Sequence, residues 1–141
     1  MDLIFVCRDA LMDSVISNIG LALEAKKAGM DVGVLFTEEA LYAIAGESFR
    51  WSPLFQGRDS RTKISKNATA MGIEVGNQKD SRWTDLFRLL DQARGKGVQL
   101  LACPLWAQIL DLKERIPSQL VLMEREVFFK ELKGAKVIGG F

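Results

Sequence analysis

Cys103 is the residue of this sequence whose position most suggests chemistry. It follows the mostly apolar segment 98–102 and is followed at once by Pro104. This order predicts a buried strand that ends where a helix begins, because proline suits the first helical position, where its missing N–H is not needed. The cysteine is then the N-cap residue. Free backbone N–H groups and the positive end of the helix would favour its thiolate, which is the reactive form of the side chain.

Three further residues are candidates for a supporting role. Trp106 follows Cys103 by one helical turn and is placed to cover a thiol pocket, although an aromatic side chain there is more often part of the core. Cys7 ends the first apolar run, and the adjacent Arg8 is placed to help ionise its thiol. Burial is the simpler interpretation of both cysteines, since cysteine is among the most buried residue types.

Length and composition predict one soluble domain covering residues 1–141. An apolar share of 48% and a charged share of 26% are ordinary for a globular protein, and the length suffices for a core without disulfides. The net charge of +1 gives no overall attraction to nucleic acid or anionic lipid. No apolar run approaches the ~20 residues of a membrane span, and the start of the chain is unlike a signal peptide. Two cysteines without a disulfide framework favour the cytoplasm.

The sequence lacks the residues that several common types of functional site require. The chain has no histidine, and two cysteines alone cannot complete a structural zinc site. No G-x-G-x-x-G follows the first strand, where Asp9 and Asp13 stand instead, and no C-x-x-C occurs. The loops after the two cysteines lack the arginine of a cysteine phosphatase, and a phosphoacceptor domain would need an aspartate at Cys103. Asp9 and Asp13 are adequately explained as helix caps. We therefore expect no metal and no organic cofactor.

Apolar runs and helical periodicity alternate along the chain. Strands are predicted at residues 2–7, 31–37, 98–103, 120–123 and 136–139. Residues 72–76 are either an edge strand or a connection. One helix places Trp83, Leu86 and Leu90 on a single face. Helices are predicted from a cap at Asp13 or Ser14 to about residue 28, over 38–45, over 59–71, from a cap at Ser81 to Gly95, over 104–115 and over 126–133.

The alternation predicts an α/β fold, a three-layer α/β/α sandwich with a mainly parallel, flavodoxin-like sheet of about five strands. The commonest order of such a sheet, 2-1-3-4-5, makes the first and third strands neighbours at the point where ligands bind. Under that order Cys7 and Cys103 end adjacent strands, about 5 Å apart. The sequence thus predicts that the two thiols lie close together.

The middle of the chain carries a group of basic residues. A solvated helix face is the simpler interpretation, and a grip on an anionic substrate or an acidic partner is the alternative. Aromatic residues are not interleaved with these cations, so we expect no direct nucleic-acid binding. The residues are Arg58, Arg61, Lys63 and Lys66.

Three segments give the chain a resemblance to the DsrE/DsrF-like family of small sulfur-relay proteins. These are 22–37 in the first strand–helix–strand unit, 101–106 around Cys103, and 131–138 near the end. Residues 45–80 have no counterpart, and Met30 stands where the family often has histidine. The resemblance implies a flavodoxin-like sheet, a homo-oligomer such as a trimer or hexamer, and a cysteine that carries a persulfide. Cys103 is the position that matches that cysteine.

Three functions follow as hypotheses. The first is a sulfur carrier or sulfurtransferase that passes persulfide sulfur from Cys103 to an acceptor protein. The second is a thiol-redox or regulatory module in which Cys7 and Cys103 form a reversible disulfide. The third is a non-catalytic, oligomeric binding protein with a buried cysteine. The sulfur donor, the acceptor and the role of residues 58–66 stay open.

Overall fold

The strands of the protein form one parallel sheet in the order β4-β3-β2-β1-β5. The computed structural model describes residues 1–46, 49–80 and 82–139. Residues of β1, β2 and β3 are mostly buried, as expected for apolar strands covered on both faces. The strands are β1 (Leu3–Cys7), β2 (Val32–Phe36), β3 (Gln99–Ala102), β4 (Val121–Leu122) and β5 (Lys136–Gly139).

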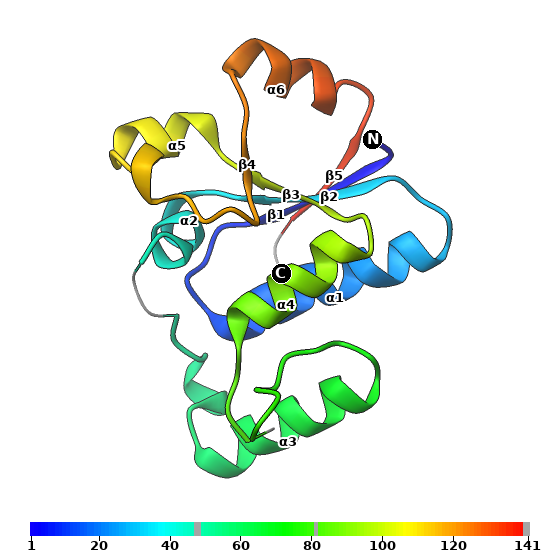
Figure 1. Cartoon of the computed structure of the whole chain (residues 1–141), viewed down its shortest axis with the longest axis vertical. Helices are drawn as coiled ribbons and strands as arrows, with labels where there is room; N and C mark the ends of the chain where they lie inside the picture. Colours follow the sequence, from blue (N-terminus) through cyan, green and yellow to red (C-terminus); the bar gives the residue numbers. More distant parts are fainter. Residues whose placement is uncertain (47–48, 81, 140–141) are drawn as a thin grey trace.

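Helices cover both faces of this sheet (Figure 1). In that view α1 and α4 lie below the strands, α6 lies above them, and α3 lies beyond α1. The helices α2 and α5 follow the carboxyl ends of β2 and β3. The helical elements are α1 (Met12–Lys27), α2 (Glu38–Ile44), the 3₁₀ turn η1 (Pro53–Phe55), α3 (Arg58–Ala70), α4 (Leu86–Gly95), α5 (Pro104–Ile109), the 3₁₀ turn η2 (Lys113–Arg115) and α6 (Arg125–Leu132).

The predicted fold class is confirmed, since the structure is a three-layer α/β sandwich with an all-parallel, five-stranded sheet. None of the helices in the described part of the chain is both long and apolar enough to cross a membrane.

The expected strand order 2-1-3-4-5 is wrong, because β2 lies between β1 and β3. Phe36 of β2 pairs with Cys7 on one side and with Ala102 on the other. The chain steps from β1 to β2, β3 and β4 in one direction, and α6 then returns it to β5 at the other side of β1. Buried residues line both faces of β2, as they do in β1, so face burial alone does not decide which of the two strands lies beside β3.

Two predicted helices have different limits in the structure. The helix expected over 104–115 ends at Ile109, and Asp111 adopts a left-handed φ of 54°. Its turn is closed by hydrogen bonds from the N–H of Asp111 to the carbonyl of Gln108 (3.1 Å) and from Leu112 to Ala107 (2.8 Å). Leu112, which follows this turn, is buried in the core.

The helix expected from Ser81 begins later. Ser81 lies outside the described residues, and Asp85 is the N-cap of α4, where its carboxylate accepts a hydrogen bond from the N–H of Arg88 (3.1 Å). Trp83 therefore precedes the helix and is 63% exposed instead of lining its buried face. Residues 72–76 are a connection, in which Gly76 forms an isolated bridge with Thr84.

Asp13 does not cap the first helix. The helix α1 begins at Met12 with Leu11 as its N-cap. The carboxylate of Asp13 instead accepts hydrogen bonds from the backbone N–H and the hydroxyl of Ser52, at 2.9 and 2.6 Å. It therefore fixes the segment that leads from α2 toward α3 against the start of α1.

The packing of α4 gives a stability prediction. Leu90 is fully buried, so Leu90→Ala should lower the free energy of unfolding by about 2–5 kcal/mol through lost burial and a residual cavity. Leu54 is 87% exposed, and Leu54→Ala is the matched control, with an expected loss within about 0.5 kcal/mol. Urea denaturation followed by circular dichroism measures both. Equal losses would contradict the assignment of Leu90 to the core.

Candidate functional site at the carboxyl edge of the sheet

Cys103 lies where the sequence predicts it, between β3 and α5. It is the N-cap residue of α5, with extended backbone (φ −63°, ψ 117°), and Pro104 occupies the first helical position. Its N–H donates to the carbonyl of Phe36 (3.0 Å), and its carbonyl accepts the first helical hydrogen bond from Ala107 (2.9 Å). The side chain is partly buried against the core. The backbone is thus fixed on both sides of a thiol that keeps some access to solvent.

Cys7 has a different environment. Its side chain is fully buried. Burial raises the pKa of the Cys7 thiol to about 12, and the nearby charge of Asp9 adds to the rise. Hydrogen bonds from the Asp9 backbone and the Asn18 side chain oppose this rise without cancelling it. Cys7 is therefore a protonated core residue at neutral pH, as its simpler interpretation predicts.

The predicted proximity of the two cysteines is wrong. β2 separates β1 from β3, and Cys7 pairs in register with Phe36, whose carbonyl binds the N–H of Cys103. Two strand spacings correspond to roughly 9–10 Å. A disulfide needs Cα atoms within about 7 Å, so these cysteines cannot form one without movement of the backbone. Both are free thiols in the structure.

Arg8 does not assist Cys7. Its exposed guanidinium points to Glu38 at the start of α2, with Nε and Nη2 each 3.2 Å from the same carboxylate oxygen. The carbonyl of Arg8 also accepts a hydrogen bond from the N–H of Ala40 (3.0 Å). This ion pair joins the ends of β1 and β2 at the same edge of the sheet as Cys103.

Glu38 is the residue of this edge that the sequence analysis missed. Its φ of 54° lies in the left-handed region, which is unfavourable for a residue with a side chain. Such strain clusters at functional sites. The backbone conformation leaves no mark in the residue type, since glutamate is common at helix starts; a glycine or asparagine would have been a signal.

Trp106 packs partly buried against the core, beside the helix start that carries Cys103. Next to this helix start lies a mostly polar cavity of about 420 Å³, which includes Pro104, Gln108 and Arg125. The Arg125 guanidinium donates to the side-chain oxygen of Gln108 and links α6 to α5. Pro104 lines this cavity, but Cys103 itself does not.

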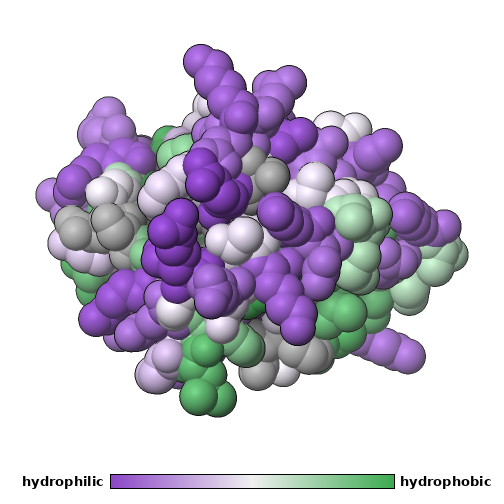
Figure 2. Space-filling view, turned by 90° about the horizontal axis from the view of Figure 1, so that it is seen from below, coloured by the Kyte–Doolittle hydropathy of each residue, from purple (hydrophilic) through white to green (hydrophobic). Residues whose placement is uncertain are grey.

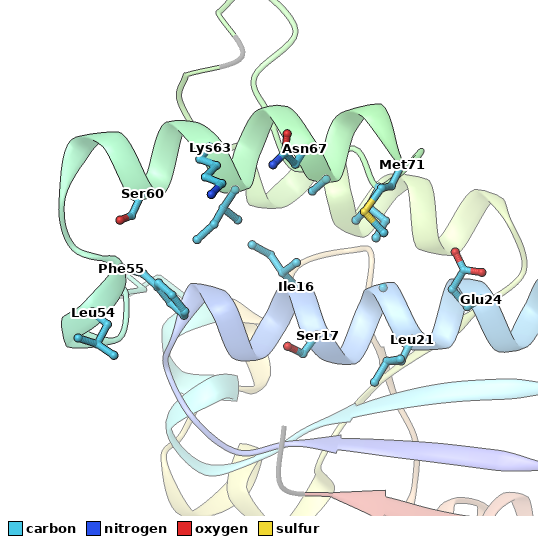
Figure 3. Close-up of a pocket in the computed structure, with 14 residues that line it drawn as sticks. Ile16, Ser17, Leu21, Glu24, Leu54, Phe55, Ser60, Lys63, Asn67 and Met71 are labelled. Atoms are coloured by element: carbon cyan, nitrogen blue, oxygen red, sulfur yellow. The ribbon is translucent and has the colours of Figure 1, made fainter.

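The basic group of the sequence is divided between two surfaces. Lys63 belongs to a cavity of about 830 Å³, which lies between α1 and α3 and is mainly apolar (Figure 3). There Ile16 of α1 points toward α3, and Phe55 lies at one end. Arg58 and Arg61 line a separate, smaller cavity. Figure 2 shows the molecule from the side on which α3 lies, where hydrophilic residues predominate and hydrophobic ones gather toward the margins.

Comparison with known proteins adds no assignment, since no family model and no curated protein matches the chain. Among the described residues, no group of three or more histidine, cysteine, aspartate or glutamate side chains is arranged to hold a metal ion. At the carboxyl edge of the sheet the structure shows a partly accessible thiol, Cys103, and the Arg8–Glu38 ion pair.

The different environments of the cysteines predict selective alkylation. With iodoacetamide at about pH 8, Cys103 should be modified in the folded protein and Cys7 should not, because thiolate and access are both required. In urea both should react. Peptide mass spectrometry locates the label, and Cys7→Ala should leave the labelling of the native protein unchanged. Modification of Cys7 in the folded protein at a rate comparable to Cys103 would contradict this assignment.

Proposed function

We propose that the protein is a sulfur carrier or sulfurtransferase that holds a persulfide on Cys103 and passes its outer sulfur to an acceptor protein. The observation that supports this most is the contrast between the two thiols: Cys103 is partly accessible at a helix start, whereas Cys7 is fully buried. The resemblance of residues 101–106 to the persulfide segment of DsrE/DsrF-like proteins points to the same residue.

The reaction uses two thiol exchange steps. In the first, the Cys103 thiolate attacks the outer sulfur of a donor such as thiosulfate. A new S–S bond forms, the S–S bond of thiosulfate breaks, and sulfite leaves with the electron pair. In the second, an acceptor thiolate attacks the terminal sulfur of the persulfide and Cys103 leaves as a thiolate. Neither step needs a metal or an organic cofactor.

Particular parts of the site suit these steps. Cys103 is the N-cap residue of α5, so its side chain stands at the start of a helix and is not enclosed within a strand. Leu105, directly after Pro104, is half exposed and offers an apolar contact to an acceptor. Unpaired cysteines suit a reducing compartment, so we place this function in the cytoplasm.

Incubation with thiosulfate or polysulfide tests the proposal. Intact-mass spectrometry should show a gain of about 32 Da, the mass of one sulfur atom, that is reversed by dithiothreitol. Cys103→Ser should abolish the gain, and Cys7→Ala should retain it. An equal gain in wild type and Cys103→Ser, or none in wild type, would rule out Cys103 as the carrier.

We also propose that the protein is a homo-oligomer, a trimer or hexamer as the resemblance implies. The part of the chain after β3 leaves several large apolar side chains exposed, which a subunit interface would bury. The two edge strands, β4 and β5, also each have one side open to another chain. The exposed residues are Leu105, Ile109, Val121, Val127, Phe129 and Val137.

Phe129 allows a test of self-association. It lies on α6, is 67% exposed, and contacts Phe128 edge to face at a centroid distance of 5.5 Å. Phe129→Ser should shift the protein toward its 15.7 kDa monomer, measured by size-exclusion chromatography with light scattering. Phe87→Ser, on α4 below the sheet, is the control and should keep the oligomer. A wild-type monomer at micromolar concentration would contradict the proposal.

A further inference from the structure

A cavity of about 320 Å³ lies on the α3 side of the molecule, formed by segments distant in the sequence. One tryptophan comes from the segment before η1, two arginines and a threonine come from α3, and an arginine, a tryptophan and a threonine come from the loop before α4. The cavity shares no residue with the edge that carries Cys103. Its lining consists of Trp51, Arg58, Arg61, Thr62, Arg82, Trp83 and Thr84.

The charges at this cavity are only partly compensated. The Arg82 guanidinium donates to both carboxylate oxygens of Asp80, from Nε at 3.0 and 3.2 Å and from Nη2 at 2.8 Å, so its charge is compensated. Arg58 and Arg61 form no ion pair within residues 1–46, 49–80 and 82–139. Asp59 lies beside them in the first turn of α3 but does not line the cavity. Two guanidinium charges are therefore left for an anion.

The side chain of Arg61 gives independent evidence, because one of its N–H groups lacks a hydrogen-bond acceptor among the described residues. Its Nε is buried and has no hydrogen-bond partner in the described part of the chain. A buried guanidinium N–H without an acceptor is costly, because the group has lost water without gaining a replacement. An oxygen of a bound anion would supply that acceptor, and arginine binds phosphate through paired N–H groups.

The N-terminus of α3 adds to the positive charge at this cavity. This helix of 13 residues begins at Arg58, and Gly57 at its N-cap has no side chain to accept hydrogen bonds from the first turn. The first N–H groups and the positive end of the helix dipole therefore favour an anion at this place. The cavity lies next to this turn, since it is lined by Arg58, Arg61 and Thr62.

The tryptophans indicate the rest of the ligand. Trp83 is 63% exposed and Trp51 is half-buried, so indole surface is open at a cavity that also holds uncompensated cations. Indole faces stack on planar rings, including nucleobases. Ligand pockets span about 300–1,000 Å³, so this one, near the lower limit, suits a single ring system with one anionic group.

We propose that this arginine–tryptophan pocket binds a small aromatic anion of the nucleoside monophosphate class. Arg58 and Arg61 bind the phosphate, and the base lies against Trp83 or Trp51. The site is separate from the sulfur-carrier function proposed for Cys103, and either one stands without the other.

Isothermal titration calorimetry of the whole protein with AMP, adenosine and inorganic phosphate tests this pocket. AMP should give saturable binding, and adenosine and phosphate should each bind at least about tenfold more weakly, since each lacks one of the two recognised groups. Absence of saturable AMP binding would overturn the proposal. Phosphate binding as tight as that of AMP would overturn the role of the aromatic ring.

Variants assign the binding to the pocket. Arg61→Gln should weaken AMP binding at least about tenfold through loss of a charge-assisted contact, and Arg58→Gln, at an exposed position, gives the same test if Arg61→Gln disturbs folding. Trp83→Leu should weaken AMP but not phosphate. Lys66→Gln removes an exposed charge from the same helix outside the cavity and should leave affinity within about twofold. Equal losses in the arginine and Lys66 variants would show general charge attraction and contradict a defined site.

Discussion

The hydrogen-bond ladder of β2 with its two neighbours determines where every candidate residue of the carboxyl edge lies. The carbonyl of Phe36 accepts from Cys103, and the N–H of Thr37 donates to the carbonyl of Cys7. These bonds align the ends of β1, β2 and β3, so the first residues after each strand emerge at one edge. The Arg8–Glu38 pair and the start of α5 occupy their positions because the ladder ends there.

Individual strands and helix starts could be predicted where interactions between neighbouring residues in the sequence determine them. The apolar runs of β1, β2 and β3 permit little except buried strands, and Pro104 marks the start of α5. The strand order was not predictable in this way. β1 and β2 are both apolar on two faces, and the long connection from Thr37 to Val98 permits β3 to join either of them. The predicted contact of the two thiols was wrong for that reason.

The same distinction between local and long-range interactions applies to the site residues. The position of Cys103 could be predicted because the residues that determine it, the strand before it and Pro104 after it, are its neighbours in the sequence. Asp13 looked like a cap, yet its carboxylate binds Ser52, 39 residues away, and no local pattern contains such a partner. Trp83 was assigned to a helix by its spacing from Leu86 and Leu90, but Asp85 begins the helix and leaves the indole outside. The arginines of α3 and the tryptophans become neighbours only through tertiary structure.

The placement of β2 between the two cysteines has a kinetic consequence. The chain has two cysteines, and the second is sealed in the core behind a strand. An oxidised or sulfur-loaded Cys103 thus has no internal thiol to discharge it. Its lifetime is set by encounters with thiols outside the chain, and its decay should scale with their concentration. Under the proposed sulfur-carrier function, Cys103 would therefore release its sulfur only on encounter with a thiol of another molecule.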